Sequence, residues 1–127
     1  MRVLLADHHT IVRQAVKSVL EEEGFEVVGE ASDGRQAVNR CRFLKPEVAV
    51  LDLWMPRLNG VEAAREIRRI CPCTQVVILM THMADRYVLE RIQSGIKGYV
   101  LKADAATELV DALHAIAKCE THIVRSS

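Results

Sequence analysis

Residues 48–60, VAVLDLWMPRLNG, contain the pattern that decides the fold. Four apolar residues without polar alternation, Val48 to Leu51, are typical of a strand buried on both faces of a parallel sheet. Asp52 follows at once, and Pro56 and Gly60 bracket a loop before the next helical stripe. The segment therefore predicts a buried strand that ends in an acid, followed by a loop and a helix.

The same alternation of apolar and amphipathic runs occurs five times along the chain. We expect strands at residues 3–6, 26–31, 48–51, 76–79 and 99–101. Apolar residues at helical spacing follow at residues 11–20, 37–44, 61–70, 88–92 and 109–117. Five such units predict an α/β fold with a doubly wound, five-stranded parallel sheet between two helical layers. The strand order 2-1-3-4-5, one of the two common solutions, gives a flavodoxin-like three-layer sandwich.

Composition narrows the class of protein. A chain of 127 residues predicts one domain, and a 4% aromatic content within a 50% hydrophobic composition predicts an aliphatic core. Lys plus Arg equals Asp plus Glu, 17 of each, so this domain alone has no basic excess for nucleic-acid binding. No apolar run has the length of a membrane span, and the first residues lack a signal-peptide pattern, so we expect a cytoplasmic protein without membrane contact.

The chain has four cysteines, which we expect to be reduced thiols with structural roles. Cys71 and Cys73 form a C-x-C pair, and no second pair follows at the spacing of a zinc site. A redox or metal role for these thiols is the alternative.

Polar side chains follow several of the expected strands. Because ligands bind at the carboxyl ends of parallel strands, these side chains form a candidate site. Two carboxylates beside a lysine suit a divalent cation and a carboxylate nucleophile toward phosphorus. The residues alone leave open that the two acids only cap the following helices. The residues concerned are Asp7, His8, His9, Asp52, Met80, Thr81, His82 and Lys102.

Three segments resemble the response-regulator receiver family of two-component signalling. They are residues 3–7 (VLLAD), residues 52–56 (DLWMP) with Gly60 four residues on, and residues 98–102 (GYVLK). The resemblance covers essentially the whole chain, and its motifs are specific.

The resemblance implies a receiver domain over residues 1–120, with residues 121–127 as a tail or the start of a linker. His9, Tyr87-Val88 and Gly98-Tyr99 resemble the subfamily that usually carries a C-terminal helix-turn-helix DNA-binding domain. We therefore expect a signalling switch and not an enzyme. The implied partners are a sensor histidine kinase, a DNA-binding output domain in a longer chain, and a second copy that binds through the late helices.

The resemblance also assigns roles to individual residues. Asp52 is the expected phosphoacceptor and Lys102 the group that neutralises the phosphoryl charge. Asp7, Asp52 and the backbone carbonyl of Trp54 are the expected Mg²⁺ ligands. Tyr99 is the expected aromatic switch, whose side-chain position reports the active state.

Two positions depart from the family pattern. The family has a second acid after the first strand, where this chain has His8. Because Mg²⁺ prefers oxygen ligands, we expect weakened Mg²⁺ binding. The family has Ser or Thr directly after the fourth strand, where this chain has Met80, with Thr81 one residue later. Neighbouring residues of a strand point to opposite faces, so Thr81 reaches the site only through a slip or bulge.

These departures leave alternatives open. In one, His8 joins Asp7 and Asp52 in a transition-metal site, since imidazole suits such metals. In another, a protonated His8 pairs with Asp52 and partly replaces the cation. The alternative function is an atypical receiver that acts as a phosphorylation-independent protein-interaction module, because His8 and Met80 replace the usual acid and hydroxyl.

Overall fold

The computed structural model describes residues 1–91 and 95–126. The five strands are β1 (Arg2–Ala6), β2 (Glu26–Ala31), β3 (Val48–Asp52), β4 (Gln75–Met80) and β5 (Ile96–Leu101). The five α-helices are α1 (Thr10–Glu22), α2 (Gly34–Leu44), α3 (Gly60–Ile70), α4 (Ala84–Arg91) and α5 (Val110–Ser126). A 3-10 turn, η1 (Lys102–Asp104), and a π-helical turn, η2 (Ala105–Leu109), lead into α5.

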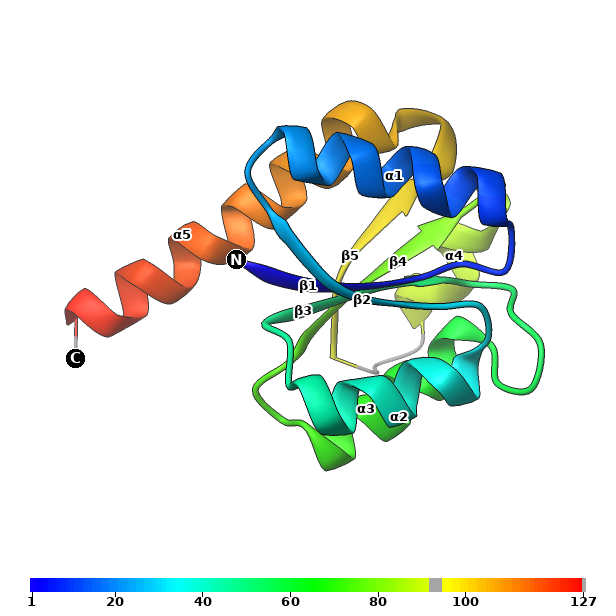
Figure 1. The fold of residues 1–127 in the computed structure, drawn as a ribbon, viewed down its shortest axis with the longest axis horizontal. Helices are drawn as coiled ribbons and strands as arrows, with labels where there is room; N and C mark the ends of the chain where they lie inside the picture. The colour runs from blue at the N-terminus through cyan, green and yellow to red at the C-terminus, as the bar shows by residue number, and fades with distance from the viewer. Residues whose placement is uncertain (92–94, 127) are drawn as a thin grey trace.

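The strands form one parallel sheet in the order β2-β1-β3-β4-β5, which confirms the predicted fold class. Helices α1 and α5 cover one face, and α2, α3 and α4 cover the other (Figure 1). Strand β3 lies in the middle, so its last residue, Asp52, reaches the centre of the carboxyl edge. There Asp52 is in register with Leu79 of β4.

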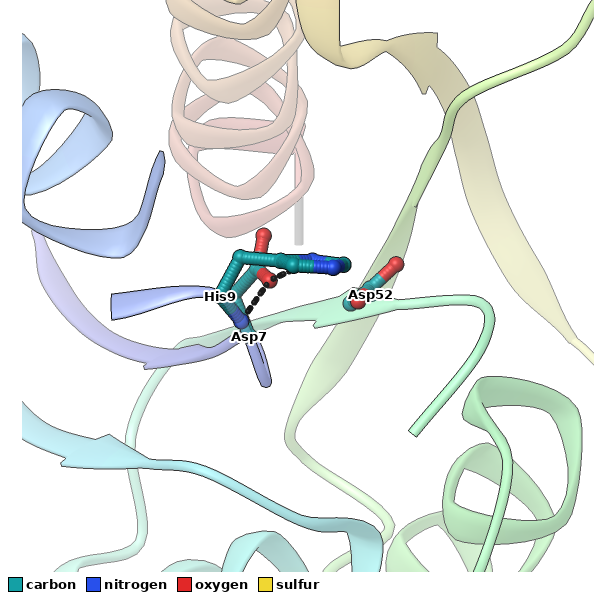
Figure 2. Close-up of side chains that lie close together, drawn as sticks. All are labelled: Asp7, His9 and Asp52. Carbon is teal, nitrogen blue, oxygen red and sulfur yellow. Dashed lines mark hydrogen bonds and ion pairs between the residues drawn. The ribbon is translucent and has the colours of Figure 1, made fainter. Parts of the chain in front are cut away.

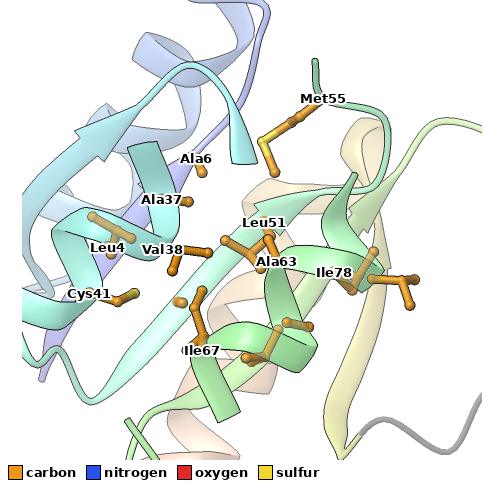
Figure 3. Packing of buried hydrophobic residues seen from close by; sticks show 14 of the residues in the cluster. Leu4, Ala6, Ala37, Val38, Cys41, Leu51, Met55, Ala63, Ile67 and Ile78 are labelled. Atoms are coloured by element: carbon orange, nitrogen blue, oxygen red, sulfur yellow. The ribbon is translucent and has the colours of Figure 1, made fainter. Parts of the chain in front are cut away.

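Each strand supplies side chains to two separate cores, which explains why the strands show no polar alternation. On β1, Leu4 and Ala6 join the core under α2 and α3, whereas Val3 and Leu5 join the core under α1 and α5. Figure 3 shows the first of these cores, in which side chains from α2 and α3 pack on the central strands. The fold therefore holds β1 and β3, which carry Asp7 and Asp52, between two packed layers.

Local hydrogen bonds fix the loop between Asp52 and α3. The Asn59 side chain accepts from the backbone N–H of Glu62 at 2.9 Å, and the Glu62 carboxylate accepts from the N–H of Asn59 at 3.0 Å. This reciprocal cap satisfies two otherwise unpaired donors at the start of α3. The same loop contacts the start of α2, where the Gly34 N–H donates to the Pro56 carbonyl at 3.3 Å.

Helix α2 begins at Gly34 behind a side-chain cap. Asp33 is the N-cap, and its side chain accepts from the backbone N–H of Gln36 at 2.8 Å. Gly34 lies directly under the β3–α3 loop: a Cβ at Gly34 would lie 2.1 Å from the Leu58 carbonyl oxygen. No side chain fits there without moving backbone, so α2 and the loop are in direct contact.

Several element boundaries differ from the sequence prediction. Strand β5 begins at Ile96, three residues earlier than expected, and pairs with β4 from Val76 onward. Helix α5 continues through Ser126, so residues 121–126, which the sequence analysis assigned to a tail or the start of a linker, are helical. In Figure 1 this part of α5 projects beyond the end of the sheet. The expected end of the fourth helix, from Ile92 to Gly95, includes residues outside the described part of the chain.

The cysteine side chains that the structure describes agree with the structural role. Cys41 and Cys71 are buried free thiols, and Cys71 donates to the Cys41 carbonyl at 3.4 Å. Burial raises the pKa of Cys41 to about 12, so its thiol stays protonated at neutral pH. Cys73 is exposed, and the side chain of Cys119 lies outside the described residues. Across residues 1–91 and 95–126, no helix combines the length and apolar character needed to cross a bilayer.

Candidate functional site at the carboxyl edge of the sheet

Three charged side chains from distant parts of the sequence meet at the carboxyl edge. Asp7 directly follows β1 and Asp52 ends β3, and the two residues are 0% and 2% exposed. The Lys102 ammonium lies 3.1 Å from Asp7 Oδ2 and 3.1 Å from Asp52 Oδ1. The structure thus brings together the two acids and the lysine that the sequence singled out.

The two carboxylates are not fully satisfied by this pairing. Asp52 Oδ1 has the Lys102 ammonium and the backbone N–H of Trp54, at 3.4 Å, as partners. Asp52 Oδ2 is shielded from solvent and has no partner among the described residues, and Asp7 Oδ2 is equally shielded, with the Lys102 ion pair as its partner. Buried polar atoms normally have partners. Desolvated carboxylate oxygens without donors are the ligands that a hard divalent cation prefers, so this part of the site fits Mg²⁺.

The burial and the charges of the cluster shift the pKa of Asp52. Burial raises the pKa of Asp52 above its ordinary value, and the nearby Asp7 carboxylate raises it further. Lys102 opposes both effects by stabilising the charged form. Two acids share one ammonium, so the ionised site carries a net negative charge inside the fold.

Asp52→Asn is expected to stabilise the domain by about 1 kcal/mol at neutral pH. Because the pKa of Asp52 is higher in the folded protein than in the unfolded chain, the folded state binds more protons between those two values. The free energy of unfolding therefore falls as pH rises through that window, and the cost reaches its full size above the folded-state pKa. Lys102 keeps Asp7 as its partner in the variant.

Urea denaturation followed by circular dichroism measures this gain. The gain should be present at about pH 7.5 and absent below about pH 3.9, the ordinary pKa of aspartate in an unfolded chain. An equal gain at both pH values would contradict the assigned cost of burying the Asp52 charge.

His9, and not His8, is the histidine that the structure places with the two acids. Asp7, His9 and Asp52 each offer a ligand atom, and these atoms lie within 4.8 Å of one another. The His9 ring reaches from the end of β1 toward Asp52 (Figure 2). His8 is exposed and is not a member of this group among the described residues, although its ring centroid lies 5.7 Å from that of His9.

The sequence analysis listed His9 among the strand-end residues but gave the metal-ligand role to His8. His9 is the N-cap of α1 and its side chain is 63% exposed. The Asp7 carboxylate accepts from the His9 backbone N–H at 2.8 Å, and this turn brings His9 Nδ1 to 3.4 Å from the same oxygen. An Asp two residues before an expected helix start is a signal for such a turn.

The hydroxyl position at the end of β4 is occupied by a core residue. Met80 is the last residue of β4, pairs with Leu101, is fully buried, and belongs to the core under α2 and α3. Thr81 lies beyond the strand and is exposed. His82 is also exposed in this loop. The loop after β4 therefore presents a threonine to solvent, and the strand end presents a thioether to the core.

Tyr99 connects β5 to α4. Its hydroxyl donates to the Leu89 carbonyl at 3.1 Å, and its own carbonyl accepts from the Arg86 guanidinium at 3.2 Å. The ring is half-buried and packs against the core that includes Met80. Both contacts join Tyr99 to the helix that follows the carboxyl edge.

Comparisons with known proteins agree with this architecture. The family model for the response regulator receiver domain matches residues 3–114. The chemotaxis protein CheY of Thermotoga maritima is 33% identical over 117 residues, which cover 92% of this chain and 98% of CheY. The transcriptional regulatory protein YxjL of Bacillus subtilis is 40% identical over 121 residues, which cover 94% of this chain and 56% of YxjL.

Solved structures give the same result. The signal receiver domain of a NarL response regulator from Mycobacterium tuberculosis is 35% identical to this chain and superposes with a TM-score of 0.84. The match covers 92% of this chain and 95% of that domain. The chain spans about half the length of the curated transcriptional regulators that it matches.

Proposed function

Because this chain belongs to the response regulator receiver family, we propose that it accepts a phosphoryl group on Asp52 from a sensor histidine kinase and thereby switches an output domain or partner. The observation that carries this proposal is the state of the Asp52 carboxylate. One of its oxygens is held by Lys102 and the Trp54 peptide, and the other is buried without a donor at the carboxyl edge. This carboxylate is oriented and only partly neutralised, which suits a nucleophile.

In the proposed reaction, Asp52 Oδ2 attacks phosphorus and forms an acyl phosphate. The bond from phosphorus to the imidazole nitrogen of the kinase phosphohistidine breaks, and that nitrogen keeps the electron pair. Lys102 lies on the neighbouring oxygen of Asp52 and supplies positive charge to the phosphoryl oxygens. The domain acts as a switch with one acceptor, and not as an enzyme that releases a product.

We expect Asp7, Asp52 and the Trp54 carbonyl to hold a divalent cation, for which Mg²⁺ is the family's usual ion. When bound, the cation supplies further charge neutralisation to the phosphoryl oxygens. The burial of both acids and the unpartnered Asp52 Oδ2 support this assignment. His8, exposed where the family has its second acid, is expected to weaken Mg²⁺ binding because one anionic ligand is missing.

Tyr99 and α4 are the proposed route to the output. A new charge at Asp52 changes the ion pairing of Lys102. Lys102 directly follows β5, the strand that carries Tyr99. Keeping or breaking the hydrogen bond from the Tyr99 hydroxyl to the Leu89 carbonyl would then select between two positions of α4 relative to β5. Receivers among the relatives occur in transcriptional regulators. A DNA-binding domain in a longer cytoplasmic chain is therefore the proposed output, with pairing of two copies through the late helices.

A phosphorylation-independent interaction module is the second candidate, and Met80 favours it. A thioether buried in the core cannot donate a hydrogen bond to a phosphoryl oxygen, and Thr81 is exposed beyond the strand end. In this function the α4 and β5 surface binds its partner whether or not Asp52 carries phosphate. The two candidates make opposite predictions for one experiment.

Intact-mass spectrometry after incubation with acetyl phosphate and Mg²⁺ is that experiment. We expect the parent chain to gain one phosphoryl group and Asp52→Asn to gain none, because Asp52 is the acceptor. A conventional receiver treated in parallel controls for the reagent, and circular dichroism controls for folding. A folded parent chain that gains no mass, beside a labelled control receiver, would refute the phosphoacceptor and leave the interaction module.

A further inference from the structure

The geometry points to a mixed carboxylate–imidazole metal site in which Asp7, Asp52 and His9 bind a transition-metal dication in preference to Mg²⁺. This inference deepens the proposed function, on which it rests for the role of the cation, by naming the class of metal. In this site His9 contributes a nitrogen ligand that a purely acidic site does not have.

The first support is the arrangement of the ligand atoms. One atom from each of Asp7, His9 and Asp52 lies within 4.8 Å of the other two. Transition metals bind nitrogen and oxygen at about 2.1 Å, so neighbouring ligands of a tetrahedral ion are about 3.4 Å apart. Three atoms within 4.8 Å of one another lie at most about 2.8 Å from a common centre, so each ligand atom needs to move inward by about 0.7 Å or less. The 63% exposed His9 ring is free to make that adjustment.

The second support is the burial of the two carboxylates. The Asp7 and Asp52 side chains are 0% and 3% exposed, and Asp52 Oδ2 has no partner among the described residues. A buried carboxylate oxygen without a partner costs free energy, which a bound cation would recover. The His9 ring lies beside both carboxylates at this edge (Figure 2).

The donor set selects between metals. Lys102 opposes any dication by the same charge repulsion, so it does not discriminate among them. Replacing an acid by His8 removes an oxygen ligand, which penalises Mg²⁺ most because Mg²⁺ demands an octahedron of oxygens. The His9 imidazole adds a ligand that Mn²⁺, Co²⁺ and Zn²⁺ accept and Mg²⁺ does not favour. Both changes move the preference in the same direction.

The backbone holds His9 ready for this role. Asp7 Oδ1 accepts from the His9 N–H at 2.8 Å, which fixes the turn, and Asp7 Oδ2 forms the ion pair with Lys102. Three protein ligands leave further coordination positions open to solvent or a phosphoryl oxygen, as in metal sites that carry out chemistry. A transition metal at this site is therefore compatible with the proposed acceptor.

Calorimetric titration of the unphosphorylated chain with Co²⁺ and with Mg²⁺, at about pH 7.5, tests the inference. A Cys73→Ser background removes the exposed thiol from competition for Co²⁺. We expect Co²⁺ to bind at least tenfold more tightly than Mg²⁺. His9→Asn should lower the Co²⁺ affinity at least tenfold, change the visible absorption of bound Co²⁺, and leave the Mg²⁺ affinity within about twofold, since only Co²⁺ uses the imidazole.

Three further variants make the result specific. His82→Asn removes an exposed histidine in the loop after β4 and should change neither affinity. Asp52→Asn should weaken both metals. Equal loss of Co²⁺ and Mg²⁺ in His9→Asn, an unchanged Co²⁺ affinity, or a loss caused by His8→Asn in its place would overturn the assignment. Since no phosphoryl donor is present, failure of phosphorylation and failure of this metal site are separate outcomes.

Discussion

Lys102→Met is expected to lower the free energy of unfolding by about 3–5 kcal/mol at neutral pH, the usual cost of removing one partner from a buried ion pair. The Lys102 side chain is 12% exposed and lies 3.1 Å from both acids, so its loss leaves two buried carboxylates without a cation. The pKa of Asp52, which Lys102 holds down, should then rise further. The loss of stability should therefore shrink as pH falls and the acids become protonated.

Chemical denaturation followed by circular dichroism checks this prediction. Lys97→Met is the matched control, because Lys97 is exposed and lies on β5, the strand that ends just before Lys102. Its effect should stay within about 0.5 kcal/mol. The double variant Lys102→Met with Asp52→Asn should recover a large part of the loss by removing one of the two unpaired charges. A loss that is independent of pH and of Asp52 would show that Lys102 acts by packing alone.

Gly34→Ala is expected to destabilise the domain by about 3 kcal/mol, although alanine favours helices intrinsically. The added Cβ would lie 2.1 Å from the carbonyl oxygen and 2.5 Å from the Cβ of Leu58. The nearest obstacle is backbone, which cannot rotate away as a flexible side chain can. The β3–α3 loop, which begins beside Asp52 and ends at the Asn59 cap, must therefore shift.

Thermal and chemical unfolding measure the size of this effect, and hydrogen exchange locates it. Gly98→Ala serves as control, because a Cβ there would meet only Val77 at an ordinary 3.9 Å. We expect faster amide exchange in residues 53–59 in Gly34→Ala, and not in Gly98→Ala. Unchanged stability in Gly34→Ala would mean that the loop and α2 separate freely.

The strands of the sheet were predictable from sequence because burial on two faces leaves a strong signal, whereas their order came from the common arrangement of such units. The apolar run Val48 to Leu51 gave β3 to within one residue. Strand β5 was less clear, since Ile96 and Lys97 precede Gly98 and do not form a continuous apolar run. They join the sheet because Ile96 pairs with Val76 of β4, a contact distant in sequence.

The candidate site was predictable where charged residues follow strand ends. It was less predictable where a backbone turn sets the position of a side chain. Asp7, Asp52 and Lys102 follow from the topology, and the structure brings them together. His9 does not, because its approach to Asp7 depends on a turn closed by one backbone hydrogen bond. The metal and phosphoryl roles of these residues stay predictions.

Trp54 gives the chain a built-in optical reporter of the carboxyl edge. It is the only tryptophan, its peptide N–H lies 3.4 Å from Asp52 Oδ1, and its indole is 60% exposed. An indole that already faces water changes its environment little on unfolding, so its fluorescence is a poor probe of global stability. The same indole stands two residues from the acceptor, where a bound ion or a new acyl phosphate alters its surroundings. Emission from this chain therefore follows events at the site more closely than the state of the fold.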